Sequence, residues 1–263
     1  MKITIIGAGN IGSALVTGLL QEGSTAVGDL CLTDVSNEAL EPFATTGINT
    51  MQDNFAAVSD ADIIVLCIKP YQVLEIIEEI APILPEKALL VSLAAGVSFF
   101  EIEQFTNSRD IHLFRAVPNI AMSVCQSMTC VAASGNTDEE QCNAILELFC
   151  LVGEAILVDE AFIDKATVVA SCGTAFALRY LHAATAAAVE IGLSPDIATA
   201  MIAQTMLGAA EVVLKSGNHP EVEIDKVTTP GGITIKGLNT MEHAGFSSAV
   251  MKGIAAAFEK LNV

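Results

Sequence analysis

A glycine-rich turn near the start of the chain limits its possible folds more than any other feature. The β-branched run at 3–6 has the character of a buried strand, and three glycines follow at once. Apolar residues then recur from Asn10 to Leu20 at helical spacing. In such a G-x-G-x-x-G turn the glycines permit a sharp bend, a close approach of pyrophosphate, and close packing of helix on strand. The segment predicts a dinucleotide site, although the same glycines also suit an ordinary turn. The expected cofactor residues here are Ile6, Gly7, Ala8, Gly9, Asn10, Ile11 and Gly12.

A carboxylate follows the next expected strand, Leu30–Thr33. Asp34 lies about 20 residues after the last glycine of the turn, the spacing at which an acid receives ribose hydroxyls. No arginine occurs in the stretch 33–38, and a carboxylate repels a phosphate. Asp34 therefore favours NADH over NADPH, although Ser36 and Asn37 could still bind a phosphate.

Strands and helices alternate through the first half of the chain. Helices are expected over 37–46, 72–80 and 138–151, and Ser98 with Glu101 has the spacing of a capping box. Strands are also expected over 48–50, 62–68, 89–93, 111–117, 128–133 and 155–158. This pattern predicts a Rossmann-like α/β domain over 1–158 with a doubly wound, mostly parallel sheet. Ligands of such sheets lie beyond the carboxyl ends of the strands. We therefore also expect Lys69, Pro70, Ala94, Ala95, Gly96 and Asn119 at the cofactor.

From Asp159 onward the strand signal ends. Helices are expected over 159–191, 195–215, 221–228, 233–242 and 247–261, so 159–263 is predicted to be an all-helical domain. The stretch 166–188 is rich in alanine and lets neighbouring helices approach closely. It suits a dimer interface, or an ordinary core helix.

The composition limits which binding partners and which cellular compartment we expect for this chain. Of 263 residues 52% are hydrophobic, but no uninterrupted apolar run has the length of a membrane span and no signal pattern begins the chain. We expect a cytoplasmic protein whose surplus apolar surface is buried in helix–helix packing and between subunits. The net charge of −19 argues against nucleic acid and anionic membranes, yet backbone amides can hold a cofactor phosphate. The seven cysteines and four histidines lack metal-ligand spacing, so no metal is expected.

A second loop, at 228–234 (TTPGGIT), precedes a predicted helix. Its two glycines allow a ligand close to the backbone, and the N–H groups of the helix start suit a carboxylate or phosphate. The Thr234 hydroxyl could donate a hydrogen bond beside that anion. A plain helix start after a proline–glycine loop explains the same residues equally well.

The stretch 227–242 (VTTPGGITIKGLNTME) is similar to the C-terminal signature of pyrroline-5-carboxylate reductases. Other landmarks of that family occur here in order, at 7–12 (GAGNIG), 53–54 (DN), 67–70 (CIKP), 94–96 (AAG) and 115–119 (RAVPN). The resemblance implies a Rossmann domain followed by a helical dimerisation domain. It adds Asn54, Cys67 and Ile68 to the expected cofactor residues.

The resemblance further implies reduction of 1-pyrroline-5-carboxylate to L-proline, the last step of proline biosynthesis, by NADPH or NADH. Thr234 would orient the ring nitrogen, and the active unit would be at least a homodimer, with a partner subunit completing the site. The substrate would bind to Thr229, Gly231, Gly232, Ile233 and Thr234.

The chain departs from the family at two places. The stretch 170–176 (ASCGTAF) stands where the family usually has SGSGPAY, and Ile120-Ala121 stands where Thr-Pro is usual. Two alternatives stay open for this reason. One is a β-hydroxyacid dehydrogenase, for which Lys165 is the only candidate acid–base on the long helix. The other is a non-catalytic protein that senses NAD(P) and interacts with a partner.

Overall fold

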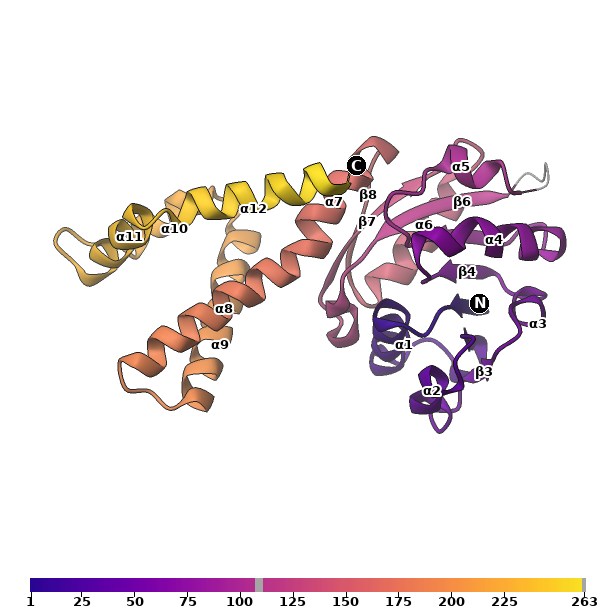
Figure 1. The fold of residues 1–263 in the computed structure, drawn as a ribbon, viewed down its shortest axis with the longest axis horizontal. Helices are drawn as coiled ribbons and strands as arrows, with labels where there is room; N and C mark the ends of the chain where they lie inside the picture. Colours follow the sequence, from indigo (N-terminus) through magenta and orange to yellow (C-terminus); the bar gives the residue numbers. More distant parts are fainter. Residues whose placement is uncertain (107–110, 262–263) are drawn as a thin grey trace. The chain divides into compact units, whose positions relative to one another are not determined.

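The computed structural model describes residues 1–106 and 111–261. By contacts these fall into two compact units, which are described separately below. The first is Met1–Thr174 with Lys260 and Leu261, and the second is Ala175–Glu259 (Figure 1).

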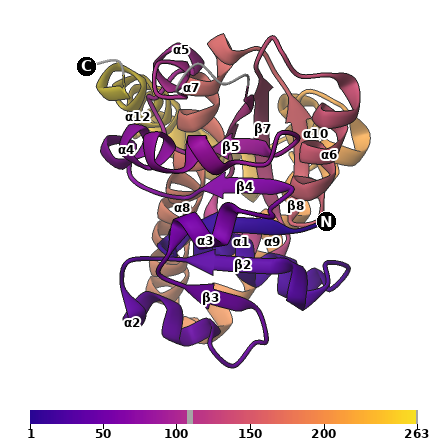
Figure 2. The ribbon, with the colours of Figure 1, turned by 90° about the vertical axis from the view of Figure 1, so that its right-hand side faces the viewer.

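The first unit is built on one eight-stranded sheet with the order β3-β2-β1-β4-β5-β6-β7-β8. Figure 2 shows β5, β4, β2 and β3 in this sheet, with β1 between β4 and β2. The strands are β1 (Ile3–Ile6), β2 (Leu30–Thr33), β3 (Asn49–Met51), β4 (Ile63–Leu66), β5 (Leu89–Ser92), β6 (His112–Val117), β7 (Ser127–Ala133) and β8 (Gly153–Leu157). All neighbouring pairs are parallel except β6 and β7. The expected doubly wound, mostly parallel α/β sheet is thus confirmed, and its order places a switch point between β1 and β4.

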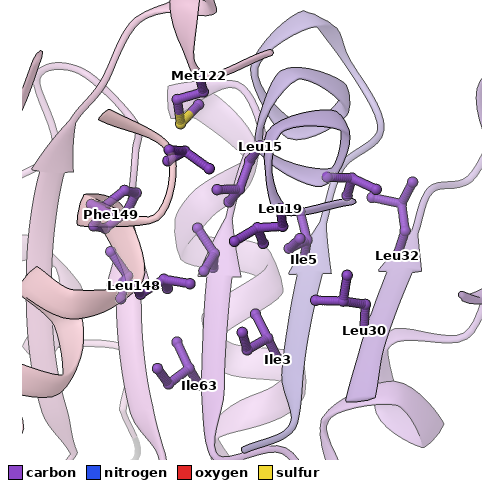
Figure 3. Close-up of a cluster of buried hydrophobic side chains, with 14 of the residues drawn as sticks. Ile3, Ile5, Leu15, Leu19, Leu30, Leu32, Ile63, Met122, Leu148 and Phe149 are labelled. Carbon is purple, nitrogen blue, oxygen red and sulfur yellow. The ribbon is translucent and has the colours of Figure 1, made fainter. Parts of the chain in front are cut away.

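Helices cover both faces of the sheet, which is why its central strands are apolar on both sides. Alternate residues of β1 show this, since Ile3 and Ile5 join one buried cluster and Ile6 joins the other. The first cluster packs under α1 and α6, with Leu15, Leu19 and Phe149 fully buried (Figure 3). The helices of this unit are α1 (Asn10–Glu22), α2 (Asn37–Leu40), α3 (Asn54–Val58), α4 (Pro70–Ile80), α5 (Phe99–Glu103), α6 (Glu139–Cys150) and α7 (Ile163–Ala166).

Helix α1 lies directly on the backbone of a short 3-10 turn, η4 (Ile120–Val124). A side chain at Gly18 would place its Cβ 2.2 Å from the carbonyl oxygen of Met122, so only glycine fits there. The thiol of Cys125, at the end of the turn, donates to the carbonyl oxygen of Gly18 at 3.5 Å. Cys125 adopts a left-handed conformation with φ 54° as the turn ends before β7, which runs antiparallel to β6.

Two predicted helices are less regular than expected. The helix predicted over 37–46 is wrong beyond Leu40, because Pro42 lacks the N–H of a continuing helix and a 3-10 turn, Glu41–Phe43, replaces it. The helix predicted over 159–191 is continuous over Glu160–Glu190 but begins as a 3-10 turn and contains a π-helical segment, Thr167–Ser171. The Ser98–Glu101 capping box is confirmed, with two hydrogen bonds at 2.8 and 3.2 Å.

The second unit is entirely helical over the residues that the structure describes. Its helices are the remainder of α8 (Cys172–Glu190), α9 (Pro195–Ser216), α10 (Pro220–Lys226), α11 (Ile233–His243) and most of α12 (Phe246–Leu261). Few of its side chains are buried in the single chain, and α10, α11 and α12 bury none. Ile191, Leu214 and Met251 are more than two-thirds exposed, which indicates a surface that another subunit covers.

Two helical stretches, Glu160–Glu190 and Pro195–Ser216, are long and apolar enough to cross a membrane by length and composition alone. Both stretches contain charged residues, so neither is an uninterrupted apolar run. Such stretches also occur as interface helices of soluble oligomers, so their length alone decides nothing.

Candidate active site

The glycine turn of the first unit begins where β1 ends. Gly7 has φ +104°, a conformation that favours glycine, and its N–H donates to the carbonyl oxygen of Thr33 at 2.7 Å. A Cβ at Gly12 would lie only 1.9 Å from the Gly7 carbonyl oxygen. The sharp bend and the close packing expected of the first and third glycines are therefore present.

Gly9 differs from its two neighbours. A Cβ added there meets no atom within 4 Å, so the fold itself leaves room for a side chain. Gly9 is also the N-cap of α1, and no side chain caps that helix. The free N–H groups and the positive end of the helix dipole thus face open space, as an anion-binding helix start requires.

A cavity of about 520 Å³ opens at this turn. It lies at the carboxyl ends of β1, β2, β4 and β5, at the switch point of the sheet. Ten of the residues expected at the cofactor line it: Ile6, Gly7, Gly9, Asn10, Ile11, Asp34, Asn54, Cys67, Ile68 and Lys69. This volume and lining fit part of an extended dinucleotide.

Seven other expected cofactor residues are not among those lining the cavity: Ala8, Gly12, Pro70, Ala94, Ala95, Gly96 and Asn119. Asn119 is buried, and both polar atoms of its side chain form hydrogen bonds within the chain. Its Oδ1 accepts from the N–H of Ala121 at 2.9 Å, and its Nδ2 donates to the Ala170 carbonyl within the π-helical segment at 3.2 Å. The structure thus gives Asn119 a contact that ties η4 to the long helix.

Five lining residues were missed from sequence: Val35, Gln72, Ile76, Leu93 and Ile120. Three of them directly adjoin expected residues in the chain. Gln72 and Ile76 lie on α4 one and two turns after Lys69, so helical spacing from Lys69 could have found them.

The adenosine-binding end that we expect at Asp34 carries fixed polar groups. One carboxylate oxygen of Asp34 accepts the N–H of Ala8 at 2.8 Å, and the other accepts the N–H of Ser36 at 2.9 Å. Asn54 opens α3, whose N-cap is Asp53. The Oδ1 of Asn54 accepts a hydrogen bond from the Thr33 hydroxyl at 2.7 Å. Among the lining residues, Asp34 is the only acid and Lys69 the only base.

Cys67 follows β4 directly as the first residue of the CIKP motif, and it adjoins the glycine turn. Burial raises the pKa of its thiol well above the ordinary range, so it stays protonated at neutral pH. A protonated buried thiol is a small apolar wall rather than a nucleophile.

Arg115, on β6, holds the beginning of the long helix against the sheet. The guanidinium is only 5% exposed and pairs with Glu160 at 2.9 Å and with Asp164 at 3.5 Å. Glu160 also accepts the N–H of Phe99 at 2.8 Å. These contacts join the start of the long helix to β6 and to the start of α5. The Nε of Arg115 has no partner among the described residues.

The second expected site, the loop 228–234, belongs to the helical unit. Gly231 has φ +70°, and the N–H of Gly232 donates to the carbonyl oxygen of Thr229 at 2.9 Å. Gly232 is the N-cap of α11, and no side chain caps this helix. Ile233 is 93% exposed, and Thr234 is exposed with a hydroxyl that bonds to no described residue. The loop therefore offers free backbone and hydroxyl donors.

Among residues 1–106 and 111–261, no three acids, cysteines or histidines come together as a metal site.

Comparisons with known proteins cover nearly the whole chain. Residues 160–262 match the family model described as pyrroline-5-carboxylate reductase dimerisation, and residues 2–96 match one described as NADP oxidoreductase, coenzyme F420-dependent. The dimerisation match covers both long apolar helices, in agreement with the expected homodimer.

Named relatives point the same way. The chain is 34% identical over 262 residues to pyrroline-5-carboxylate reductase of Methanosarcina acetivorans, covering 98% of this chain and 96% of that protein. It is 36% identical to pyrroline-5-carboxylate reductase 1 of Dictyostelium discoideum, of whose length it spans only 49%. A crystal structure of pyrroline carboxylate reductase from Plasmodium falciparum, with NADP bound, has 27% identity and a TM-score of 0.90, covering 99% of this chain and 97% of that one.

Proposed function

The chain belongs to the pyrroline-5-carboxylate reductase family, and on this premise we propose that it reduces 1-pyrroline-5-carboxylate to L-proline with a nicotinamide dinucleotide. The observation that carries this proposal is the relationship of about a third identity over almost the full length of a reductase of that name. Neither a β-hydroxyacid dehydrogenase nor a non-catalytic NAD(P) sensor is favoured by these relatives.

We propose that the first unit binds the cofactor in the cavity at the glycine turn. The uncapped start of α1 at Gly9 would hold the pyrophosphate, and Asn54, Cys67, Ile68 and Lys69 would line its path. The cofactor, when bound, supplies the hydride. The chain's own part is to fix its position and to exclude water from it.

We propose that the loop Thr229–Thr234 holds the substrate. The uncapped N–H groups at the start of α11 suit its carboxylate, and the exposed Thr234 hydroxyl suits a hydrogen bond to the ring nitrogen. An alkyl hydroxyl is a poor acid at neutral pH, so Thr234 orients the imine while solvent or the substrate iminium supplies the proton.

We propose NADH as the preferred cofactor. Asp34 places a carboxylate just after β2, at the position where an acid receives the ribose hydroxyls, and both its oxygens accept backbone N–H groups. The only basic side chain lining the cavity is Lys69. The cofactor region would be 1–158, and the substrate and dimerisation region 159–263, in a cytoplasmic homodimer or larger assembly.

The test is an assay of the purified chain with NADH or NADPH and either 1-pyrroline-5-carboxylate or a set of 3-hydroxy acids. Oxidation of the reduced cofactor is expected with the imine. No oxidation with the imine, or turnover only of the hydroxy acids with the oxidised cofactor, contradicts the proposal.

A further inference from the structure

Thr33 is a buried polar residue directly beneath the cofactor cavity. It ends β2, has no exposed surface, and donates its hydroxyl hydrogen to the Oδ1 of Asn54 at 2.7 Å. We propose that Thr33 is a positioning residue that turns the amide of Asn54 so that its NH2 group, rather than its oxygen, serves the cofactor. This inference rests on the proposed function only in requiring that a nicotinamide dinucleotide binds.

The hydrogen bond decides which end of the amide is available. An asparagine amide carries an acceptor oxygen and a donor nitrogen, and rotating it by half a turn exchanges the two. If the amide were flipped, the Thr33 oxygen would accept from Nδ2, but the buried hydroxyl hydrogen would lose its only acceptor among the described residues. An unsatisfied buried donor costs about 1–3 kcal/mol, so the orientation with Oδ1 toward Thr33 is favoured. Asn54 lines the cavity, and with its Oδ1 occupied its Nδ2 is left without a partner among the described residues.

A second polar group at the same end is fixed independently. The carboxylate of Asp34 accepts N–H groups from Ala8 and Ser36, one on each oxygen. Asp34 therefore presents acceptors and Asn54 presents donors, both in the wall of one cavity. Ribose hydroxyls donate and accept at once, so a free diol can satisfy both groups. A phosphate offers acceptors only, and it suits Asn54 but not Asp34.

Two substitutions at residue 33 separate the effect of the hydrogen bond from the effect of packing. Valine has almost the shape of threonine and suits a buried strand equally well, but it cannot donate to Asn54. Serine keeps the hydroxyl and loses only a methyl group. The pair Thr33→Val and Thr33→Ser thus separates the hydrogen bond from the packing.

The experiment is a fluorescence titration of the full chain with NADH in the absence of substrate. We expect Thr33→Val to raise the dissociation constant about 3- to 10-fold, the equivalent of one hydrogen bond, and Thr33→Ser to keep it within about twofold. In an Asn54→Ala background Thr33→Val should weaken binding no further, because the amide it positions is gone. Melting temperatures measured alongside identify any variant that fails to fold.

An unchanged dissociation constant in Thr33→Val overturns the proposal, as does an equal weakening in the Asn54→Ala background. If Thr33→Val does not fold, the Thr33→Ser and Asn54→Ala chains still decide. Loss of NADH affinity in Thr33→Ser, or none in Asn54→Ala, also overturns it. Since no imine is present, a chain that binds NADH as expected but fails to reduce 1-pyrroline-5-carboxylate contradicts the proposed function alone.

Discussion

Replacing Gly9 or Gly12 by alanine should give opposite results, although the two glycines share one turn. At Gly12 the new methyl group would lie 1.9 Å from the Gly7 carbonyl oxygen, whereas at Gly9 it would meet nothing within 4 Å. Gly12→Ala therefore strains the fold, and Gly9→Ala does not. A methyl group at position 9 would instead fill part of the open space over the start of α1, where an anion would bind.

The cost at Gly12 follows from the contact. Since side-chain Cβ atoms essentially never come within 3.0 Å of another heavy atom, the backbone at Gly7 or Gly12 must move by about 1 Å. Overpacking of this kind costs about 1–3 kcal/mol, and the upper end applies because the obstacle is backbone. Alanine's better helix propensity returns about 1 kcal/mol. The net loss of about 2 kcal/mol should lower the melting temperature by roughly 4–8 °C.

At Gly9 the stability terms nearly cancel. Its φ of −69° and ψ of −173° suit any residue, so alanine stabilises by about 0.4–1 kcal/mol through the unfolded chain. Alanine is a poorer N-cap than glycine by a similar amount. Binding should suffer instead, because one lost hydrogen bond to a charged phosphate costs about 1.5–3 kcal/mol. The dissociation constant for NADH should rise about 10- to 100-fold.

Thermal unfolding followed by circular dichroism and titration with NADH measure both variants. The expected result is a normal melting temperature with weak binding for Gly9→Ala, and a lowered melting temperature for Gly12→Ala. If Gly9→Ala binds NADH as tightly as the parent chain, the cofactor does not approach α1 at this turn. If Gly12→Ala melts normally, the contact with Gly7 is not tight.

Further substitutions test the rest of the site and the fold. Asp34→Ser should raise kcat/KM for NADPH relative to NADH by about 10-fold or more, because two like charges about 4 Å apart repel by about 1 kcal/mol in water and about 4 kcal/mol near a protein surface. An unchanged ratio removes Asp34 from cofactor selection. Thr234→Ala should lower kcat about 10-fold, the loss of one hydrogen bond to a charged group, without weakening NADH binding, and equal kcat values contradict its role. Arg115→Met should lower the free energy of unfolding, measured in urea, less than the double change Glu160→Ala and Asp164→Ala does. The double change leaves a buried cation unpaired, at a cost of about 3–5 kcal/mol. A larger loss for Arg115→Met refutes this.

The parts of the fold that follow from local patterns could be predicted from the sequence. β1 and β2 have the predicted bounds, because short β-branched or apolar runs end at a glycine or an acid. The capping box at Ser98 was predictable because both partners lie within four residues of each other. The antiparallel direction of β7 was not, since it depends on a left-handed residue, Cys125, rather than on glycine.

The parts of the candidate site that depend on distant contacts escaped prediction. The side chain of Asn119 donates to the carbonyl oxygen of Ala170, which lies 51 positions later in the chain, and no local pattern predicts this hydrogen bond. The π-helical segment holding Ala170, TVVAS, contains no glycine or proline that would mark it off from the regular helix after it. The cavity residues found from sequence, such as Gly9 and Lys69, lie at strand ends or helix starts, where topology alone fixes their edge of the sheet.

The backbone contact of α1 with the turn η4 has a consequence for how the cavity responds to a ligand. One wall begins at Gly9, at the start of α1, and another includes Ile120, at the start of η4. Because Gly18 brings the two backbones together without an intervening side chain, these walls keep a constant spacing. A dinucleotide bound as proposed would enter a slot formed in advance, and these segments would lose little conformational entropy on binding.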